Sequence, residues 1–446
     1  MFFIDHDFLV VKLCLTNVDE GAVIIMKYKM PYNWVEEIEV NDMNLVGIFS
    51  PKVFTSRKNE NEVIMKGFAS PIGTKPLRDA AKDARSVLIL SDDNSRPTPV
   101  NKLLPIILKE LGIAEVPDEN ISILMSLGTH RAMTDEEIDR KLGYGIRQRF
   151  KVFNHQWNNV DNMINLGQSK TGNDILVNKK VVEADFVIGI GNIVPHPAAG
   201  FAGGGKIVDP GCVSDETCGA FHWESVKLQA SEVLGVRDNP MIQMIDEVAE
   251  KAGLKFIVNT IMDGDNHIVR VVTGHPSKAH SEGCKTAIEV YGVEIPERAD
   301  IVICDSHPAD LEMWQAIKGL CTADLVMKND GIVIMATPCP DGASKEHPQL
   351  EQYGYRSFSE TEKLIKQGKI SLVVGHHLVQ GGRLIGRSKQ VFIVSNHLNN
   401  KTISNLGFCT AATVTDAYKQ AMEIKGQDAK VVILRNAAEL FPIMKM

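Results

Sequence analysis

The chain has 446 residues, of which 44% are hydrophobic and 23% charged, and its formal net charge is −8. This composition is typical of a globular protein, and the length predicts two or three domains. A net acidic chain lacks the dense positive charge that neutralises a run of phosphates, so we exclude nucleic acid as a partner.

The cysteines are scattered along the chain and form no CxxC pair among the eight that are present. A disulfide framework would be denser and would occur in a shorter secreted chain, so we expect reduced thiols and a cytoplasmic location. No run reaches the roughly 18 apolar residues that a membrane helix needs, and we expect no membrane partner.

The N-terminal segment, residues 1–25, mixes apolar side chains with Asp5, His6, Asp7 and Lys12. These charges interrupt the apolar core that a signal peptide or a membrane helix requires. We expect a weakly structured extension there.

Short runs rich in Val and Ile alternate with helix-like segments. Most of them lack strict alternation of apolar and polar residues, which is typical of strands buried on both faces of a parallel sheet. The expected strands are residues 86–90, 121–127, 186–190, 256–261, 301–304, 332–336, 371–374, 391–394 and 431–434.

Several intervening helices have start or stop signals of known mechanism. These signals are the capping-box pair Thr134 and Glu137, Asn239-Pro240 with Gly253, the pair Ser359 and Glu362 with Gly368, and Gly426 after residues 414–425. The regular succession of strand, helix and strand predicts an α/β fold with mainly parallel sheets.

Residues 295–298, Ile-Pro-Glu-Arg, follow a long helical stretch and precede a new strand, so we place a linker there. This divides the chain into a larger N-terminal α/β domain at 26–295, joined by part of the C-terminal tail, and a smaller C-terminal α/β domain at 296–430. We expect the active site in a cleft between the two domains.

The segment from residue 189 to residue 223 has the highest density of reactive groups. Three consecutive glycines, Gly203, Gly204 and Gly205, precede Lys206, and His196 and His222 lie on either side. Glycines allow backbone N–H groups to converge on an anion. A lysine amine can form a covalent link to a cofactor, and neutral imidazole is both a metal ligand and a general base.

Two nucleotide-binding motifs match this segment in part. Gly200, Gly205 and Lys206 satisfy GxxxxGK, but Ile207 stands where a P-loop needs Ser or Thr to bind magnesium. A dinucleotide fingerprint fails because Val194 replaces its third glycine. A nucleotide-binding phosphotransferase or ATPase that uses this loop remains the alternative function.

Two further polar clusters follow expected strands. The sequence SDDNSRPTP, with Asp93 and Arg96, follows the strand at 86–90, and GTHR, with His130, follows the strand at 121–127. In open parallel sheets, ligands bind outside the carboxyl ends of the strands, so these clusters predict a binding site.

Taken together, these motifs resemble the nickel-pincer-nucleotide-dependent lactate racemase family from about residue 26 to the C-terminus. The resemblance is carried by DNSRPTP, GTHRAMTDEE, the PHPAAGFAGGGK and FHW block, EMWQAIKG at 312–319, and SPIGTKPL at 70–77. It implies an isomerase that racemises or epimerises a small 2-hydroxy acid by hydride transfer through a 2-keto intermediate. It also implies partner enzymes that build the cofactor.

The resemblance implies which residues hold the cofactor, a nickel-bearing pyridinium-3-thioamide-5-thiocarboxylic acid mononucleotide. Lys206 would carry it covalently, and His222 would complete the square-planar coordination that nickel(II) accepts. Asp93 would help to hold the cofactor, with Gly203, Gly204 and Gly205 as backbone donors to its phosphate.

The resemblance also implies the residues that act on the substrate. His130 and His196 would be the paired acid and base groups, because histidine has a pKa near neutral pH. The substrate-binding residues would be Arg96, Trp314, Gln315 and Lys318, with Lys318 also catalytic because it steadies developing charge.

Trp314 occupies a position where the characterised lactate enzyme has tyrosine, which leaves the choice between lactate, a longer 2-hydroxy acid, malate or a sugar acid open. The roles of His155, His376 and His377 are also open. A non-catalytic homologue that keeps only the cofactor site is a further alternative, which the presence of both His130 and His196 disfavours.

Overall fold

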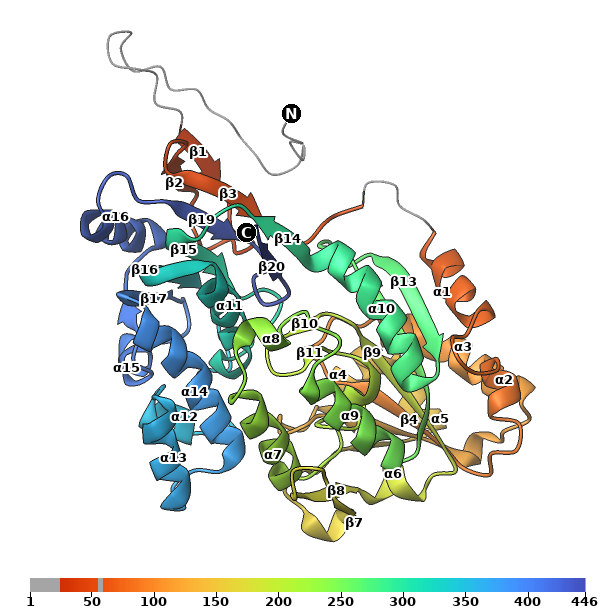
Figure 1. The fold of residues 1–446 in the computed structure, drawn as a ribbon. Coiled ribbons are helices and arrows are strands. Elements are labelled where there is room, and N and C mark those ends of the chain that lie inside the picture. The colour runs from red at the N-terminus through yellow and green to blue at the C-terminus, as the bar shows by residue number, and fades with distance from the viewer. Residues whose placement is uncertain (1–24, 55–58, 446) are drawn as a thin grey trace. The chain divides into compact units, whose positions relative to one another are not determined.

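The computed structural model describes residues 25–54 and 59–445, so nearly all of the expected N-terminal extension lies outside the described residues. The chain folds into two compact units. Unit 2 comprises Lys52–Tyr291 and Leu364–His376, and unit 1 comprises the described residues up to Pro51, Gly292–Lys363 and those from His377 onward. Each unit is an α/β structure, as the sequence predicts (Figure 1).

Unit 2 contains a six-stranded sheet. In sheet order its strands are β13 (Ile268–Gly274), β12 (Leu254–Met262), β9 (Phe186–Asn192), β4 (Val87–Asp92), β5 (Ile121–Ser126) and β6 (Lys151–Asn154). Neighbouring strands are parallel except for the antiparallel pair β12 and β13. The chain leaves β4 towards β5 and β6 and later returns to the other side of β4 with β9. In open sheets of this kind, ligands bind beyond the carboxyl ends of the strands at which the strand order reverses, here β4 and β9.

Helices cover both faces of this sheet. One face shares a core with α1 (Glu60–Ala69), α2 (Leu77–Ala80), α3 (Val100–Ile113) and α4 (Asp135–Leu142). The alternate side chains of β12 point to the other face, where α9 (Pro240–Lys251) and α10 (Pro276–Tyr291) pack. Burial on both faces explains why these strands read as nearly continuous apolar runs.

Smaller elements complete unit 2. They are α5 (Ile146–Arg149), α6 (Lys179–Glu183), α7 (Asp215–Ser225), α8 (Ala230–Val233), the antiparallel pairs β7 (Met163–Gln168) with β8 (Asp174–Asn178) and β10 (Pro195–His196) with β11 (Gly200–Phe201), and the 3-10 helices η1 (Asp118–Asn120), η2 (Val160–Asn162) and η3 (Gly204–Ile207).

Unit 1 also contains a six-stranded sheet, and all its strands are parallel. In sheet order they are β18 (Cys409–Thr410), β17 (Gln390–Val394), β16 (Met327–Ala336), β15 (Ala299–Asp305), β19 (Val431–Leu434) and β3 (Leu45–Phe49). The hairpin of β1 (Ile25–Tyr28) and β2 (Ile38–Asn41) and the parallel pair β14 (Gly292–Ile295) and β20 (Phe441–Met444) lie outside this sheet.

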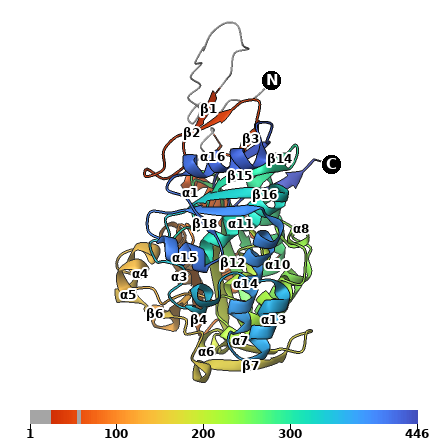
Figure 2. The same ribbon diagram turned by 90° about the vertical axis from the view of Figure 1, so that its left-hand side faces the viewer.

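Figure 2 shows α16 (Val414–Lys425) on one side of the unit 1 sheet and α11 (Met313–Val326) on the other. The first face is closed by α16 and the hairpin, which pack on Ile301 and Ile303 of the central strand. Unit 1 also contains α12 (Gln349–Tyr353), α13 (Phe358–Lys366), α14 (Leu372–Arg387) and α15 (Asn400–Asn405). Helices α13 and α14 each continue from one unit into the other.

Two details of the predicted secondary structure are wrong. Residues 371–374, expected to form a strand, begin α14, in which Val374 and Leu378 are buried one helical turn apart. The cap of α13 is Ser357, whose hydroxyl accepts the Glu360 N–H, and not Ser359. None of the helices in the described part of the chain is long and apolar enough to cross a membrane.

Candidate active site

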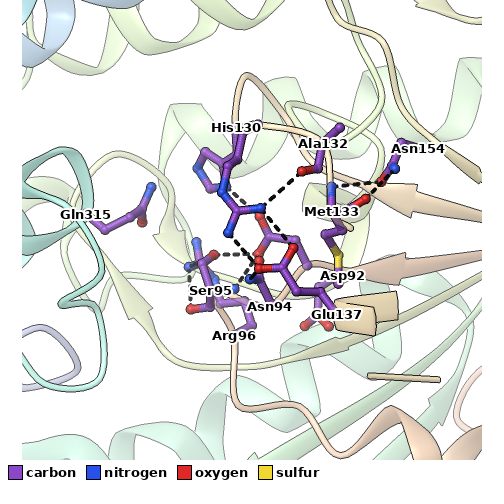
Figure 3. A network of polar contacts seen from close by, with 12 residues as sticks. Asp92, Asn94, Ser95, Arg96, His130, Ala132, Met133, Glu137, Asn154 and Gln315 are labelled. Carbon is purple, nitrogen blue, oxygen red and sulfur yellow. Dashed lines mark hydrogen bonds and ion pairs between the residues drawn. The ribbon is translucent and has the colours of Figure 1, made fainter. Parts of the chain in front are cut away.

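A buried carboxylate and an imidazole meet where β4 and β5 end. Asp93 is 5% exposed, and its Oδ2 lies 2.5 Å from Nδ1 of His130, while its Oδ1 accepts the Ser95 N–H at 3.0 Å. Because a carboxylate can only accept, His130 donates from Nδ1, and in the neutral ring the lone pair is on Nε2. Figure 3 shows His130 within a wider polar network that includes Ser95, Arg96 and Glu137.

Burial raises the pKa of Asp93, but the neighbouring His130 and Arg96 more than offset this and hold the pKa below its usual range. The carboxylate is therefore ionised at neutral pH and fixes the ring orientation of His130. Arg96, on the same loop, is half-buried and donates to the Ser95 carbonyl at 3.2 Å.

His196 has the opposite hydrogen-bond polarity. It lies on β10, just beyond the end of β9, and is 7% exposed. Its Nδ1 accepts the Ala198 N–H at 3.2 Å. Since a backbone N–H can only donate, the proton of the neutral ring is on Nε2. In the neutral rings, Nε2 of His130 can therefore accept a hydrogen bond, whereas Nε2 of His196 can donate one.

The three glycines form a tightly packed turn. Gly204 has φ +58°, and a Cβ there would lie 2.7 Å from Cγ of His280, so only glycine fits. Its N–H donates to Oδ1 of Asn259 at 2.8 Å and is therefore not offered to a phosphate. The turn leads into the 3-10 helix η3 and not into the α-helix of a P-loop, which argues against the ATPase alternative.

Lys206 lies on η3, and its side chain is half-buried. Burial lowers its pKa from 10.5 to about 8, and the positive charge of Arg96 contributes to this shift. A neutral amine is therefore accessible near physiological pH, as a nucleophilic lysine requires.

We expect competitive acetylation of the apoprotein to label Lys206 with a half-maximal rate near pH 8, well below the ordinary 10.5. Mass spectrometry of the peptides, with surface lysines as the internal reference, would measure this. Arg96→Met should move the midpoint to higher pH, because it removes a positive charge that disfavours the ammonium form. A wild-type midpoint at the ordinary value would show that burial does not depress the pKa.

His222 is oriented by its own helix. On α7 its Nδ1 donates to the Cys218 carbonyl at 2.8 Å, so Nε2 is the ring nitrogen that could coordinate a metal. The Cys218 thiol lies 3.3 Å from the same nitrogen and interacts with the charge of Lys206. The ring of His376, at the end of the unit 2 part of α14, lies 4.4 Å from that of His222.

In unit 1, the predicted substrate-binding residues begin α11. Nζ of Lys318 donates to Oε1 of Gln315 at 2.5 Å, one turn earlier. Trp314 is stacked between His347 and His377, with ring centroids 4.2 Å and 3.9 Å away. His377 also donates from Nε2 to the Trp314 carbonyl at 2.7 Å. Its visible role is therefore to hold Trp314.

His155 has a structural environment. Its Nε2 donates to the Val213 carbonyl at 2.9 Å and its Nδ1 accepts from Asn178 at 3.0 Å. Burial lowers the pKa of His155 to about 4, so the ring is neutral and holds the segment that leads into α7.

Sequence reasoning missed two buried polar residues near the site. Lys141 of α4 contacts Asp92 and the carbonyl of Arg96. A signal was present, because Lys141 falls between Ile138 and Leu142 on the apolar face of a helix whose start was predicted. The other is Asp209, which follows η3 and is 1% exposed.

Burial raises the pKa of Asp209 from 3.8 to about 7, against the lowering effect of Lys206. As the pH rises, the Asp209 carboxyl therefore ionises earlier in the unfolded chain than in the folded protein. The folded state loses stability between pH 3.8 and about 7. We expect the free energy of unfolding of Asp209→Asn, measured by urea titration, to exceed that of wild type by about 2–4 kcal/mol at about pH 8. At about pH 4 the two free energies should differ little. A stability gain that is the same at both pH values would contradict this assignment.

Comparison with known proteins identifies the family. The model of the lactate racemase N-terminal domain matches residues 33–233, and that of the lactate racemase C-terminal domain matches residues 295–441. The chain is 29% identical to the lactate racemase of Thermoanaerobacterium thermosaccharolyticum over 408 residues, which covers 89% of this chain and 94% of that protein. It is also 29% identical to the lactate racemase of Lactiplantibacillus plantarum over 404 residues, with the same coverage.

Two solved structures have the same fold as this chain. The lactate racemase apoprotein from T. thermosaccharolyticum superposes with a TM-score of 0.83 at 27% identity, covering 94% of this chain and all of that one. A protein from Thermotoga maritima, with a TM-score of 0.69 at 20% identity, shares the fold. The expected racemase, an isomerase, is confirmed by these relatives. The chain belongs to the lactate racemase family.

Proposed function

We propose that this enzyme racemises or epimerises a small 2-hydroxy acid such as lactate, with a nickel-pincer nucleotide attached to Lys206. The observation that carries the proposal is the pair of imidazoles with opposite hydrogen-bond polarity, His130 and His196, near the carboxyl ends of unit 2 strands. A racemase needs one group that takes the hydroxyl proton of a substrate and another that returns it to the enantiomer.

The proton of the substrate hydroxyl passes to Nε2 of His130, and the imidazolium that forms is stabilised by the ionised Asp93. Nε2 of His196 starts with a proton and donates it to the oxygen of the 2-keto intermediate when the opposite enantiomer is made. The proton that His130 has taken then returns to His196, so both rings are neutral again at the end of the turnover. In the reverse direction the two residues exchange roles. Each contributes a factor of about 10²–10⁴ to the rate.

The carboxylate of the substrate requires positive charge and donors. Arg96 can bind it through two parallel N–H groups, and Lys318 supplies an ammonium group that Gln315 orients. Trp314, held between His347 and His377, presents an indole in place of the smaller phenol of the characterised lactate enzyme. We therefore assign to Trp314 the choice among substrate side chains.

The residues present fit the proposed cofactor. Lys206 has an amine whose pKa burial has lowered to about 8, and His222 has its Nδ1 satisfied, so Nε2 is the ligand atom. Neutral imidazole is a common nickel ligand. When bound, the cofactor would supply a hydride acceptor for the hydrogen on C2 of the substrate. The protein positions substrate and protons around it.

The proposal implies a cytoplasmic enzyme that depends on cofactor-building partner enzymes. Its test is a screen of 2-hydroxy acids, including lactate, malate and aromatic acids, with protein produced together with those enzymes. We expect interconversion of the enantiomers of at least one acid, with deuterium retained at C2 because the hydride does not exchange with water. Deuterium lost to solvent would contradict hydride transfer, and no turnover of any acid would favour the non-catalytic alternative.

A further inference from the structure

The amine of Lys141 is buried at the base of the loop that carries Asp93 and Arg96. The residue is 9% exposed. Its Nζ lies 2.8 Å from Oδ1 of Asp92 and donates to the Arg96 carbonyl at 2.8 Å. One ammonium group thus ties the start of the loop to the residue that we assign to the substrate carboxylate.

The loop is closed by further contacts. The Thr98 hydroxyl donates to Oδ2 of Asp92, and the Arg96 N–H donates to the Asp93 carbonyl at 3.2 Å. Ser95 donates to Oδ1 of Asp93 from both its N–H and its hydroxyl. These contacts fix the position of the Asp93 carboxylate relative to Arg96. Lys141 is the cation among them, and it lies beneath the loop.

Helix α4, which carries Lys141, is also tied to the turn that carries His130. Arg131, the next residue, forms a two-pronged ion pair with Glu137 of α4 at 2.8 Å and 2.6 Å. Glu137 also accepts from Asn94 of the loop at 2.9 Å (Figure 3). One helix therefore contacts both the loop of Arg96 and the turn of His130.

We propose that Lys141 is a positioning residue that sets the spacing between Arg96 and His130, and so the fit of the substrate between a carboxylate clamp and a base. The roles of Arg96 and His130 in this inference rest on the proposed function, whereas the contacts of Lys141 do not depend on it. Its competing explanation is that Lys141 only neutralises Asp92, whose pKa burial raises and Lys141 lowers.

Three variants separate these explanations. Lys141→Met leaves the charge of Asp92 buried without its counter-ion, which destabilises the fold. The double variant Asp92→Asn/Lys141→Met removes both charges but keeps an oxygen that can accept from Thr98, so it should regain most of that stability. Lys141→Arg keeps a charge that can reach both partners. Lys102→Met, on α3, is the matched control, because its amine is paired with Glu60 at the surface.

In loaded enzyme with lactate, we expect KM to rise at least about tenfold in both Lys141→Met and the double variant, with kcat changed less than KM. Lys141→Arg should recover most of the loss, and Lys102→Met should match wild type. A double variant that regains stability together with the wild-type KM would reduce Lys141 to a counter-ion and overturn the proposal.

Hydrogen exchange of the apoprotein provides a readout that does not depend on turnover. Amides of the peptide covering residues 92–98 should exchange at least about tenfold faster in the double variant than in wild type. The two proteins are compared under conditions in which their unfolding midpoints are the same. Equal exchange rates would refute the positioning role even if the enzyme is active. Faster exchange in an enzyme that racemises nothing would support it while the proposed function fails.

Discussion

Replacing Lys206 by alanine is expected to abolish racemisation, with turnover lowered by more than about 10⁴-fold, because the step that the cofactor supplies contributes most of the acceleration. The amine at this position is the group that we assign to the covalent attachment. Its lowered pKa, about 8, makes the neutral nucleophile available. Chiral chromatography of lactate after incubation with loaded protein would measure the loss.

Two controls show whether the charge or the nucleophile matters at this position. Lys206→Arg keeps a positive charge, but a guanidinium stays protonated at neutral pH and cannot act as the nucleophile. It should be as inactive as the alanine variant. Lys251→Ala removes a surface lysine paired with Glu247 and should leave turnover unchanged. Turnover in Lys206→Arg within tenfold of wild type would show that no covalent link is needed.

His130→Ala is expected to lower kcat by about 10²–10⁴-fold in both directions, because one of the two proton-transfer groups is lost. Removing the imidazole also leaves the buried carboxylate of Asp93 with fewer partners, so folding should be checked by circular dichroism. Stopped assays that start from each pure enantiomer would measure the effect.

Asp93→Asn is the companion variant, since it keeps the shape of the side chain and removes its charge. Without the carboxylate the tautomer of His130 is no longer fixed, and we expect a smaller loss of about 10–100-fold. If Asp93→Asn were as inactive as His130→Ala, the carboxylate would have a direct role in the reaction. An unchanged rate in His130→Ala would remove that residue from the mechanism.

Much of the fold could be predicted because the strands of both sheets are buried on two faces. Runs such as those of β4 and β9 are nearly all apolar, so they stand out without any alternation. Helix ends with a chemical cap were also predictable: α4 has the capping box of Thr134 and Glu137, and α9 begins at Pro240 behind Asn239.

The failures have physical causes. Residues 371–374 are apolar and β-branched enough to suggest a strand, and only the contacts of Val374 and Leu378 in the folded chain make them helical. The two-residue strands β10 and β11 have too few residues for any periodicity. These strands are defined by their pairing across a short turn, Pro195 with Phe201 and His196 with Gly200.

The candidate site shows the same division. Because polar groups followed three strands, their meeting near β4, β5 and β9 could be predicted from the rule for parallel sheets. The ring nitrogen that carries the proton could not be predicted for either histidine. It depends on Asp93 for His130 and on the Ala198 N–H for His196. The same holds for Lys141, whose importance comes from the backbone carbonyl that it reaches.

The central claim is that Lys206 holds a nickel-bearing cofactor. The most direct measurement is peptide mass spectrometry of protein produced with the cofactor-building enzymes, together with nickel analysis of the same sample. We predict an adduct confined to the peptide that contains Lys206, with nickel present in an amount equal to the adduct. Fully active protein with an unmodified Lys206, or with no nickel, would contradict it.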